Sequence, residues 1–170
     1  MQAIALGACA ALLATQVAAA RRLSAVRVDL VRVDQARLEQ ELLGPTDRPR
    51  LLHVWTSWCG PCRAELPLLS KALRLRKRRG IEVTMLALDE PSAEPELRRL
   101  VARAGALVGK LRVVLPAQAL PVMLRIDPAW DGSVPASYLL DAHGALVFAQ
   151  RGLSIVPELM QEIDHLLGTE

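Results

Sequence analysis

The chain has 170 residues, of which 52% are hydrophobic and 23% are charged. This mixture excludes a disordered or fibrous protein, because it supplies enough apolar side chains for a core and enough charged ones for a wetted surface. The 21 basic and 18 acidic side chains leave a net charge of +3, which indicates no particular class of partner. With an N-terminal leader set aside, the remaining length is that of one ordinary domain.

The first residues have the composition of a targeting segment. Residues 3–20 carry no charge and are almost entirely Ala, Leu, Ile, Val and Gly. Ala18 and Ala20 fit a small-x-small cleavage pattern, although the usual basic residues before the apolar run are missing. We therefore predict a signal peptide at residues 1–20 and one folded domain at residues 21–170. The alternative is an uncleaved membrane tether through the apolar run, but the two arginines that follow would then oppose the positive-inside bias.

The apolar positions predict strands that alternate with helices along most of the chain. Four prolines between Pro116 and Pro135 favour irregular loop over regular structure there. The expected fold class is therefore α/β, a mixed central sheet with helices on both faces, its parallel strands first and its antiparallel strands last. Strands are expected at residues 26–33, 51–55, 81–88, 111–115, 137–140 and 145–149, and helices at residues 35–43, 59–79, 94–104 and from about 157 onwards.

A dense group of basic residues closes the second predicted helix. Nucleic-acid binding is not expected, because no aromatic stacking residues or binding motif accompany these charges. Cations are favoured at a helix C-terminus, and the glycine that follows supplies the stop. The residues are Arg74, Arg76, Lys77, Arg78 and Arg79, followed by Gly80.

Two cysteines stand at the junction between a predicted strand and the helix that follows it. Cys59 should begin that helix, where unpaired backbone amides and the helix dipole stabilise a thiolate, so we expect Cys59 to be the nucleophile. Cys62 lies one turn further in and should be the buried resolving thiol. Gly60 is expected to permit a tight turn, and Pro61 suits a first helical turn because no amide partner is lost there.

Two other uses of this cysteine pair are less favoured. A zinc site normally needs four Cys or His ligands, whereas the predicted domain has two cysteines and three scattered histidines. A purely structural disulfide that closes so small a loop would constrain the unfolded chain only weakly. The sequence therefore predicts redox chemistry without a cofactor or a metal ion.

The motif Trp58-Cys59-Gly60-Pro61-Cys62 resembles the active site of the thioredoxin superfamily, and Pro67 matches the kinking proline of its next helix. The run from Cys62 to Pro67 looks like the TlpA/ResA branch of extracytoplasmic thioredoxins. The segment 134–144 resembles the cis-proline loop and hairpin of that branch. The resemblance implies that Pro135 is cis and that the backbone of Val134 pairs with an extended substrate segment. It also implies a location in the bacterial periplasm or on the outer face of the membrane.

Two further side chains are candidates for proton transfer. His53 occupies the position, six residues before the first cysteine, where cytoplasmic thioredoxins carry a buried acid. Its imidazole could accept the Cys62 proton, or it could be a core histidine bonded to a backbone carbonyl. Glu65 matches an acid that tunes the thiols in ResA-like proteins, but it could equally be a surface residue. We expect Trp55 to lie in the core and Trp58 to form the rim that partners touch.

The resemblance implies a thiol-disulfide oxidoreductase that reduces disulfides in exported proteins, with Cys59 attacking and Cys62 resolving. Its substrates would be protein thiols and disulfides, including those of apocytochrome c. Electrons would come from a membrane reductase of the CcdA or DsbD kind. A disulfide oxidase or isomerase is the nearest alternative, and a metal-delivery or other binding protein on the same fold is an alternative of another class.

Overall fold

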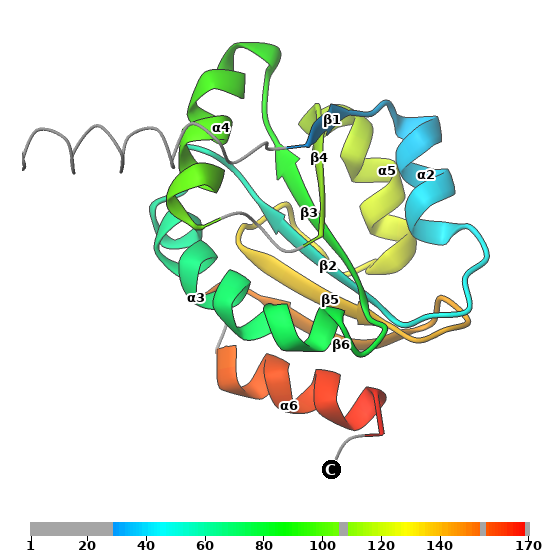
Figure 1. Cartoon of the computed structure of the whole chain (residues 1–170). Helices are drawn as coiled ribbons and strands as arrows, with labels where there is room; N and C mark the ends of the chain where they lie inside the picture. Colours follow the sequence, from blue (N-terminus) through cyan, green and yellow to red (C-terminus); the bar gives the residue numbers. More distant parts are fainter. Residues whose placement is uncertain (1–28, 106–108, 154–155, 169–170) are drawn as a thin grey trace, which may run out of the picture.

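A computed structural model describes residues 29–105, 109–153 and 156–168 (Figure 1). The predicted leader at residues 1–20 and the start of the first predicted strand lie outside the described residues. Within the described ranges, no helix is both long enough and apolar enough to cross a membrane. The elements are β1 (Leu30–Arg32), α2 (Gln35–Leu43), β2 (Arg50–Trp55), α3 (Gly60–Lys77), β3 (Glu82–Leu88), the 3-10 turn η1 (Pro91–Ala93), α4 (Glu94–Arg103), β4 (Lys110–Val114), α5 (Pro116–Ile126), β5 (Ala136–Leu140), β6 (Leu146–Arg151) and α6 (Val156–Leu166).

The strands form one mixed sheet in the order β1-β4-β3-β2-β5-β6. The four strands from β1 to β2 are parallel, and β5 and β6 add an antiparallel hairpin beside β2. The predicted α/β class and the predicted order of parallel and antiparallel strands are therefore confirmed. The central strand β2 is buried at all six positions, as is typical of a strand covered by helices on both faces.

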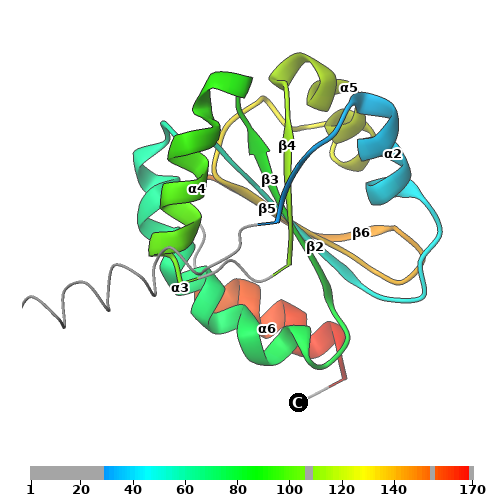
Figure 2. The same ribbon diagram turned by 45° about the horizontal axis from the view of Figure 1, so that its top comes forward.

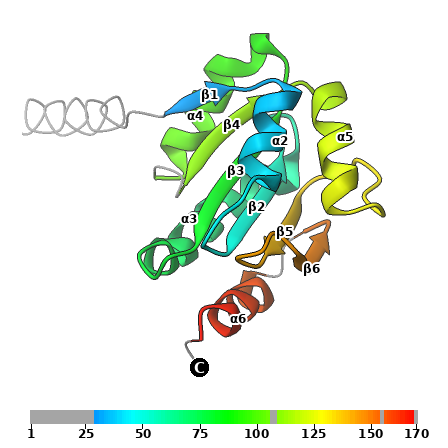
Figure 3. The same ribbon diagram turned by 90° about the vertical axis from the view of Figure 1, so that its right-hand side faces the viewer.

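Helices cover both faces of the sheet (Figures 2 and 3). The helices α3, α4 and α6 pack on one face, where their leucines join alternate residues of the strands in one apolar cluster. The helices α2 and α5 pack on the opposite face around a second cluster. Alternate residues of β2 divide between the two clusters, with Leu51 and Trp55 on the α3 face and Leu52 and Val54 on the α2 face.

The prediction of irregular structure between Pro116 and Pro135 is wrong for its first half, which forms the helix α5. Pro116 lies in the first helical turn, where a missing amide proton removes no hydrogen bond. Pro121 lies inside the helix on its exposed side, so its local cost is offset by burial of the opposite face. That buried face has helical spacing, with Ala119, Val122, Met123 and Ile126 all inside the second cluster.

Part of the basic group at the end of α3 joins that helix to its neighbours. The Nε atom of Arg76 donates to Asp164 of α6 at 3.0 Å, and Arg79 reaches the same carboxylate at 3.3 Å. Arg74 donates to the backbone oxygen of Gly105, just after α4. The contacts with Asp164 hold α6 against the C-terminal half of α3. The cysteines are at the other end of α3.

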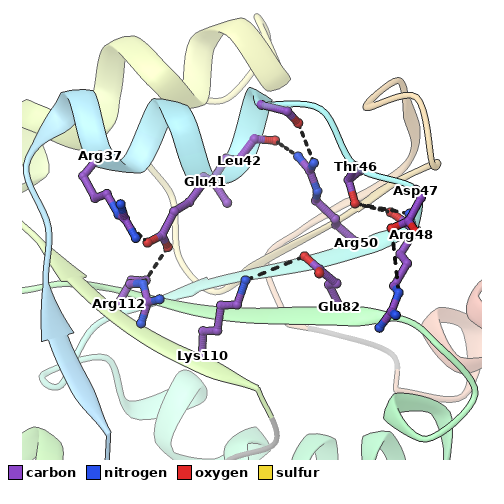
Figure 4. Close-up of polar contacts among 11 residues, drawn as sticks. Arg37, Glu41, Leu42, Thr46, Asp47, Arg48, Arg50, Glu82, Lys110 and Arg112 are labelled. Carbon is purple, nitrogen blue, oxygen red and sulfur yellow. Dashed lines mark hydrogen bonds and ion pairs between the residues drawn. The ribbon is translucent and has the colours of Figure 1, made fainter.

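At the opposite end of the sheet, where β2, β3 and β4 begin, charged side chains pair with one another and with a helix end (Figure 4). Arg50 is buried and donates to the backbone oxygens of Leu42 and Gly44, which close α2. Two ion pairs lie nearby: Arg112 contacts Glu41 at 2.6 Å, and Lys110 contacts Glu82 at 3.8 Å.

Candidate redox site

Cys59 and Cys62 form a disulfide at the N-terminal end of α3, just beyond the C-terminal end of β2. The two side chains differ in exposure as predicted, since Cys59 is 5% exposed and Cys62 is fully buried. Trp58, directly before them, is 73% exposed, whereas Trp55 is fully buried. The predicted rim and core positions of these two tryptophans are therefore confirmed.

Cys59 is the N-cap residue of α3, which confirms its predicted place at the start of that helix. Its backbone is extended, and its Sγ atom accepts a hydrogen bond from the backbone amide of Cys62 at 3.1 Å. A sulfur in this position faces the amides that a helix leaves unpaired in its first turn. When the disulfide is reduced, the same donor can stabilise a thiolate on Cys59.

The two residues between the cysteines have different roles in the backbone. Pro61 lies in the first turn of α3, as predicted. The φ angle of Gly60 is not in the left-handed region, so the backbone there does not depend on glycine. A Cβ atom added to Gly60 would have no heavy atom within 4 Å, so the fold itself does not require glycine there.

A buried carboxylate fixes the segment before Cys59. Asp89, at the end of β3, is 3% exposed and accepts hydrogen bonds from the backbone amide of Ser57 at 3.0 Å and from its hydroxyl at 2.6 Å. A carboxylate held by two donors positions the turn that connects β2 to α3. Sequence analysis did not pair Asp89 with Ser57, because the two residues come from separate segments of the chain.

The loop before β5 brings a second backbone segment to the disulfide. The Val134–Pro135 peptide bond is cis, as the resemblance implied. The backbone oxygen of Val134 lies 3.8 Å from Sγ of Cys59, and the backbone oxygen of Pro135 accepts from the amide of Gly152 at 2.8 Å. Val134 is half-buried, so part of its surface remains accessible beside the cysteines.

An ion pair lies near this loop. Arg151 of β6 donates from Nε and Nη2 to the two oxygens of Asp127, at 2.7 and 2.6 Å. Hydrogen bonds from Arg151 hold the pKa of the Asp127 carboxyl below its usual value, although burial opposes this. Trp130, between Asp127 and the cis bond, is 5% exposed and donates from its ring to the backbone oxygen of Ser133. Sequence analysis did not find the pair, because its two residues come from separate elements.

His53 and Glu65 lie together beneath the cysteines, which sequence analysis did not predict. Nε2 of His53 lies 3.1 Å from Oε1 of Glu65, and Nδ1 of His53 lies 2.9 Å from Oγ of Ser137. His53 is fully buried and Glu65 is 4% exposed, so the interpretation of Glu65 as a surface residue is wrong. The alternative that His53 is bonded to a backbone carbonyl is also wrong, because both of its ring nitrogens face side chains.

The helix geometry places Glu65 next to Cys62. The two residues are three apart on α3 and both are buried against the sheet, so their side chains lie on one face of the helix. Glu65 can therefore contact both the resolving cysteine and the imidazole.

Within the described ranges, no three His, Cys, Asp or Glu side chains come together as a candidate metal site.

The chain is similar to known proteins in both sequence and structure. No protein-family model matches the chain. The thioredoxin-like protein YneN of Bacillus subtilis is 25% identical over 114 residues, which cover 67% of this chain and 62% of YneN. The thiol-disulfide oxidoreductase ResA of Halalkalibacterium halodurans is 27% identical over 119 residues, covering 70% of this chain and 62% of that protein. The chain thus spans less than two thirds of the length of these relatives.

Solved structures of other proteins have a similar fold. A DsbE-type thiol:disulfide interchange protein from Chlorobium tepidum matches with a TM-score of 0.59 and 25% identity, over 72% of this chain and 82% of that chain. StoA from Bacillus subtilis matches with a TM-score of 0.52 and 19% identity, over 68% of this chain and 82% of that chain. The second likeness concerns the fold alone.

Proposed function

We propose that this chain, which is a ResA-like member of the thioredoxin superfamily, is a thiol-disulfide oxidoreductase acting on protein thiols and disulfides outside the cytoplasm. The observation that carries the proposal is the Cys59–Cys62 disulfide, with Cys59 at the N-cap of α3. That position stabilises a thiolate, and thiolates are the species that attack disulfides. The oxidoreductases among its relatives support the same activity.

The proposed reaction passes through a mixed disulfide. The Cys59 thiolate attacks one sulfur of a substrate disulfide, that bond breaks, and the other substrate sulfur leaves as a thiolate. Cys62 then loses its proton and attacks Sγ of Cys59, which forms the bond between the two cysteines and releases the second substrate sulfur. Two electrons pass to the substrate, and its two sulfurs take up protons from water.

The neighbours of the cysteines have distinct proposed roles. Trp58, Gly60 and Pro61 form the exposed border of the disulfide, and partner proteins would contact them. Without a side chain at Gly60, a partner backbone can approach the sulfur closely. The backbone at Val134 and Pro135 would pair with an extended substrate segment, as in strand addition.

The paired side chains beneath the cysteines are the proposed proton acceptor. Glu65 lies on the same helix face as Cys62 and within 3.1 Å of the His53 ring. A carboxylate beside an imidazole can hold one proton more or fewer while it stays buried, which suits a group that deprotonates Cys62. We assign the acceptor role to the pair as a unit, because the two side chains are in contact.

Reduction is the proposed physiological direction. The Gly-Pro dipeptide between the cysteines is that of thioredoxin, which lies on the reducing side of the scale. A reductase outside the cytoplasm needs electrons from within, so we propose a membrane donor of the CcdA or DsbD kind. Apocytochrome c thiols are the proposed substrate class, with residues 1–20 serving as the export signal or as a tether.

The reduction potential of the Cys59/Cys62 pair tests this proposal. The domain would be equilibrated with glutathione or dithiothreitol buffers, and the free thiols would be counted. A potential near about −270 mV or lower supports a dedicated reductase, whereas a potential near about −120 mV would instead indicate an oxidase. A Cys62→Ser variant provides the control, because it should retain a substrate as a mixed disulfide on Cys59.

A further inference from the structure

A row of polar side chains crosses the face of the sheet on which α3, α4 and α6 pack. His53 of β2 pairs directly with Ser137 of β5, and Ser137 pairs directly with Gln150 of β6. Directly opposite residues of neighbouring antiparallel strands project to the same face, about 5 Å apart at their Cβ atoms. These three side chains therefore lie side by side on the face of the sheet that α3, α4 and α6 cover.

The neighbouring row on the same face is entirely apolar. It contains Leu51, Leu139 and Phe148, which occupy the corresponding positions on the same three strands. All three belong to the cluster beneath α3 or pack against it. A polar row in such a core is costly unless its groups find partners, so its presence calls for a chemical reason.

One end of the polar row contacts the proposed proton acceptor. Ser137 Oγ lies 2.9 Å from Nδ1 of His53, whose Nε2 faces Glu65. At the other end, the side-chain oxygen Oε1 of Gln150 is buried and has no hydrogen-bond partner among the described residues. The row thus contains an unused acceptor two strands away from the imidazole.

The protonation chemistry of His53 gives that acceptor a use. Before Cys62 is deprotonated, a ring hydrogen on Nε2 facing the Glu65 carboxylate would leave Nδ1 to accept from the Ser137 hydroxyl. When the proton from Cys62 goes to Glu65, the ring hydrogen moves from Nε2 to Nδ1, so that Nε2 accepts from the Glu65 carboxyl and Nδ1 donates to Oγ of Ser137. The hydroxyl hydrogen of Ser137 must then turn to another acceptor, and Oε1 of Gln150 lies on the strand beside it.

We infer that Ser137 and Gln150 form a hydrogen-bond switch that stabilises the protonated state of the Glu65–His53 pair during resolution by Cys62. Ser137 reverses from donor to acceptor, and Gln150 receives the hydrogen that Ser137 releases. Both are positioning residues, because they act through His53 and touch neither sulfur nor substrate. This inference rests on the proposed function, since it concerns the step in which Cys62 attacks the mixed disulfide.

The groups that surround His53 define what can titrate there. On the neighbouring strands, His53 lies between Met85 of β3 and Ser137 of β5. Neither of these side chains ionises near neutral pH. The helix α3 turns Cys62 and Glu65 toward the sheet. A pH profile of the resolution step should therefore report Cys62 and the Glu65–His53 pair.

Reaction of the reduced protein with dithiobis(nitrobenzoate) separates the two steps in one experiment. The first release of thionitrobenzoate reports attack by Cys59, and the second reports resolution by Cys62. Both phases would be followed in a stopped-flow instrument from about pH 5.5 to about pH 9. Ser137→Ala should leave the first phase within about twofold and slow the second about tenfold at neutral pH, moving its profile toward the ordinary thiol pKa of about 8.5.

Three other variants show whether the effect comes from the hydroxyl. Ser137→Thr keeps the hydroxyl and should retain the wild-type second phase, while Gln150→Leu should slow that phase about threefold. Ser70→Ala is the matched control, because Ser70 is a buried serine of α3 with no hydrogen-bond partner for its hydroxyl among the described residues. It should change neither phase.

The results separate this inference from the proposed function. A wild-type second phase in Ser137→Ala, or an equal slowing in Ser137→Ala and Ser137→Thr, would overturn the switch and leave the oxidoreductase activity standing. Absence of the first phase in the wild-type protein would overturn the proposed function, and the switch with it. Nitrogen-15 shifts of the His53 ring give a readout without turnover: a Ser137→Ala change in the ring tautomer supports the switch, and an unchanged tautomer opposes it.

Discussion

The two ends of the central sheet differ in the partners that they give to buried polar side chains. Where β2, β3 and β4 begin, arginines and a lysine contact carboxylates or backbone oxygens (Figure 4). Toward the end where β2 finishes, Asp127 also pairs with an arginine, but the two buried acids nearest the cysteines have a serine and a histidine as partners. Asp89 accepts from Ser57, and Glu65 faces His53, which in turn faces Ser137.

The partners at the first end keep a fixed charge, whereas those beside the cysteines can change protonation or hydrogen-bond role. An arginine cannot lose its proton in a protein, so an ion pair such as Arg112 with Glu41 has one arrangement. Serine and histidine can donate or accept, so the groups beneath Cys62 can change protonation without moving the backbone. Substitutions at the first end should therefore change stability alone, whereas those at the cysteine end should change thiol exchange.

The largest expected effect is the loss of exchange when the proposed nucleophile is removed. Cys59→Ser should reduce disulfide exchange at least about a thousandfold, because a hydroxyl provides no thiolate. The free energy of unfolding of the reduced protein should change by less than about 0.5 kcal/mol. Insulin reduction and urea denaturation would measure the two quantities. Greater residual exchange in Cys59→Ser than in Cys62→Ser would reverse the roles of the two cysteines.

The next largest effect should come from the support of the turn before Cys59. Asp89→Ala leaves the buried amide and hydroxyl of Ser57 without their acceptor, which should cost about 3 kcal/mol of unfolding free energy. Asp89→Asn keeps one acceptor oxygen and should cost clearly less. Urea denaturation at neutral pH measures both. Equal losses in the two variants would show that this carboxylate does not hold the turn through Ser57.

At the opposite end, Arg112→Met should cost about 2 kcal/mol of stability, because the Arg112 and Glu41 side chains are each only 11% exposed. Its thiol-exchange rate should equal that of the wild type. Lys110→Met is the matched control, since its ion pair with Glu82 is longer and about half-exposed, and it should cost less than about 0.5 kcal/mol. A slower exchange in Arg112→Met would contradict the division between the two ends.

The smallest effect should appear in the acid limb of the stability curve. Burial raises the pKa of Glu41, but hydrogen bonds from Arg112 and Arg37 outweigh it and lower the pKa below the ordinary 4.5. A lowered folded pKa stabilises the protein above about pH 4.5, and that stability is lost as the pH falls through the folded value. Glu41→Gln should therefore flatten part of the loss of thermal stability below about pH 4.5, compared with wild type. An unchanged acid limb would contradict this.

The fold was largely predictable because its signals are local. The helix α2 has the bounds that its apolar spacing predicts, and Asp34 caps its start by accepting from the amide of Arg37. The helix α5 was missed because its prolines were weighed as helix breakers, although its buried positions follow helical spacing. Prolines exclude a helix only where an amide donor is needed, and at Pro116 none is needed.

The candidate site was predictable only in part, for a physical reason. Cys59 and Cys62 were found because a short motif at a strand–helix junction has a local chemical meaning. The contact of His53 with Ser137 joins residues 84 positions apart, and it depends on the register between β2 and β5. Register follows from packing of the whole sheet, so neither Ser137 nor the meeting of His53 with Glu65 could be derived from spacing.

Because the three tryptophans differ in exposure, fluorescence can report binding at the surface around the disulfide. Trp58 is 73% exposed beside the disulfide, whereas Trp55 and Trp130 are 0% and 5% exposed. Iodide, which cannot enter a packed core, would quench the emission of Trp58 and spare the other two. A bound peptide that covers the cysteines would shield Trp58 from iodide, so its occupancy could be followed by fluorescence without a label.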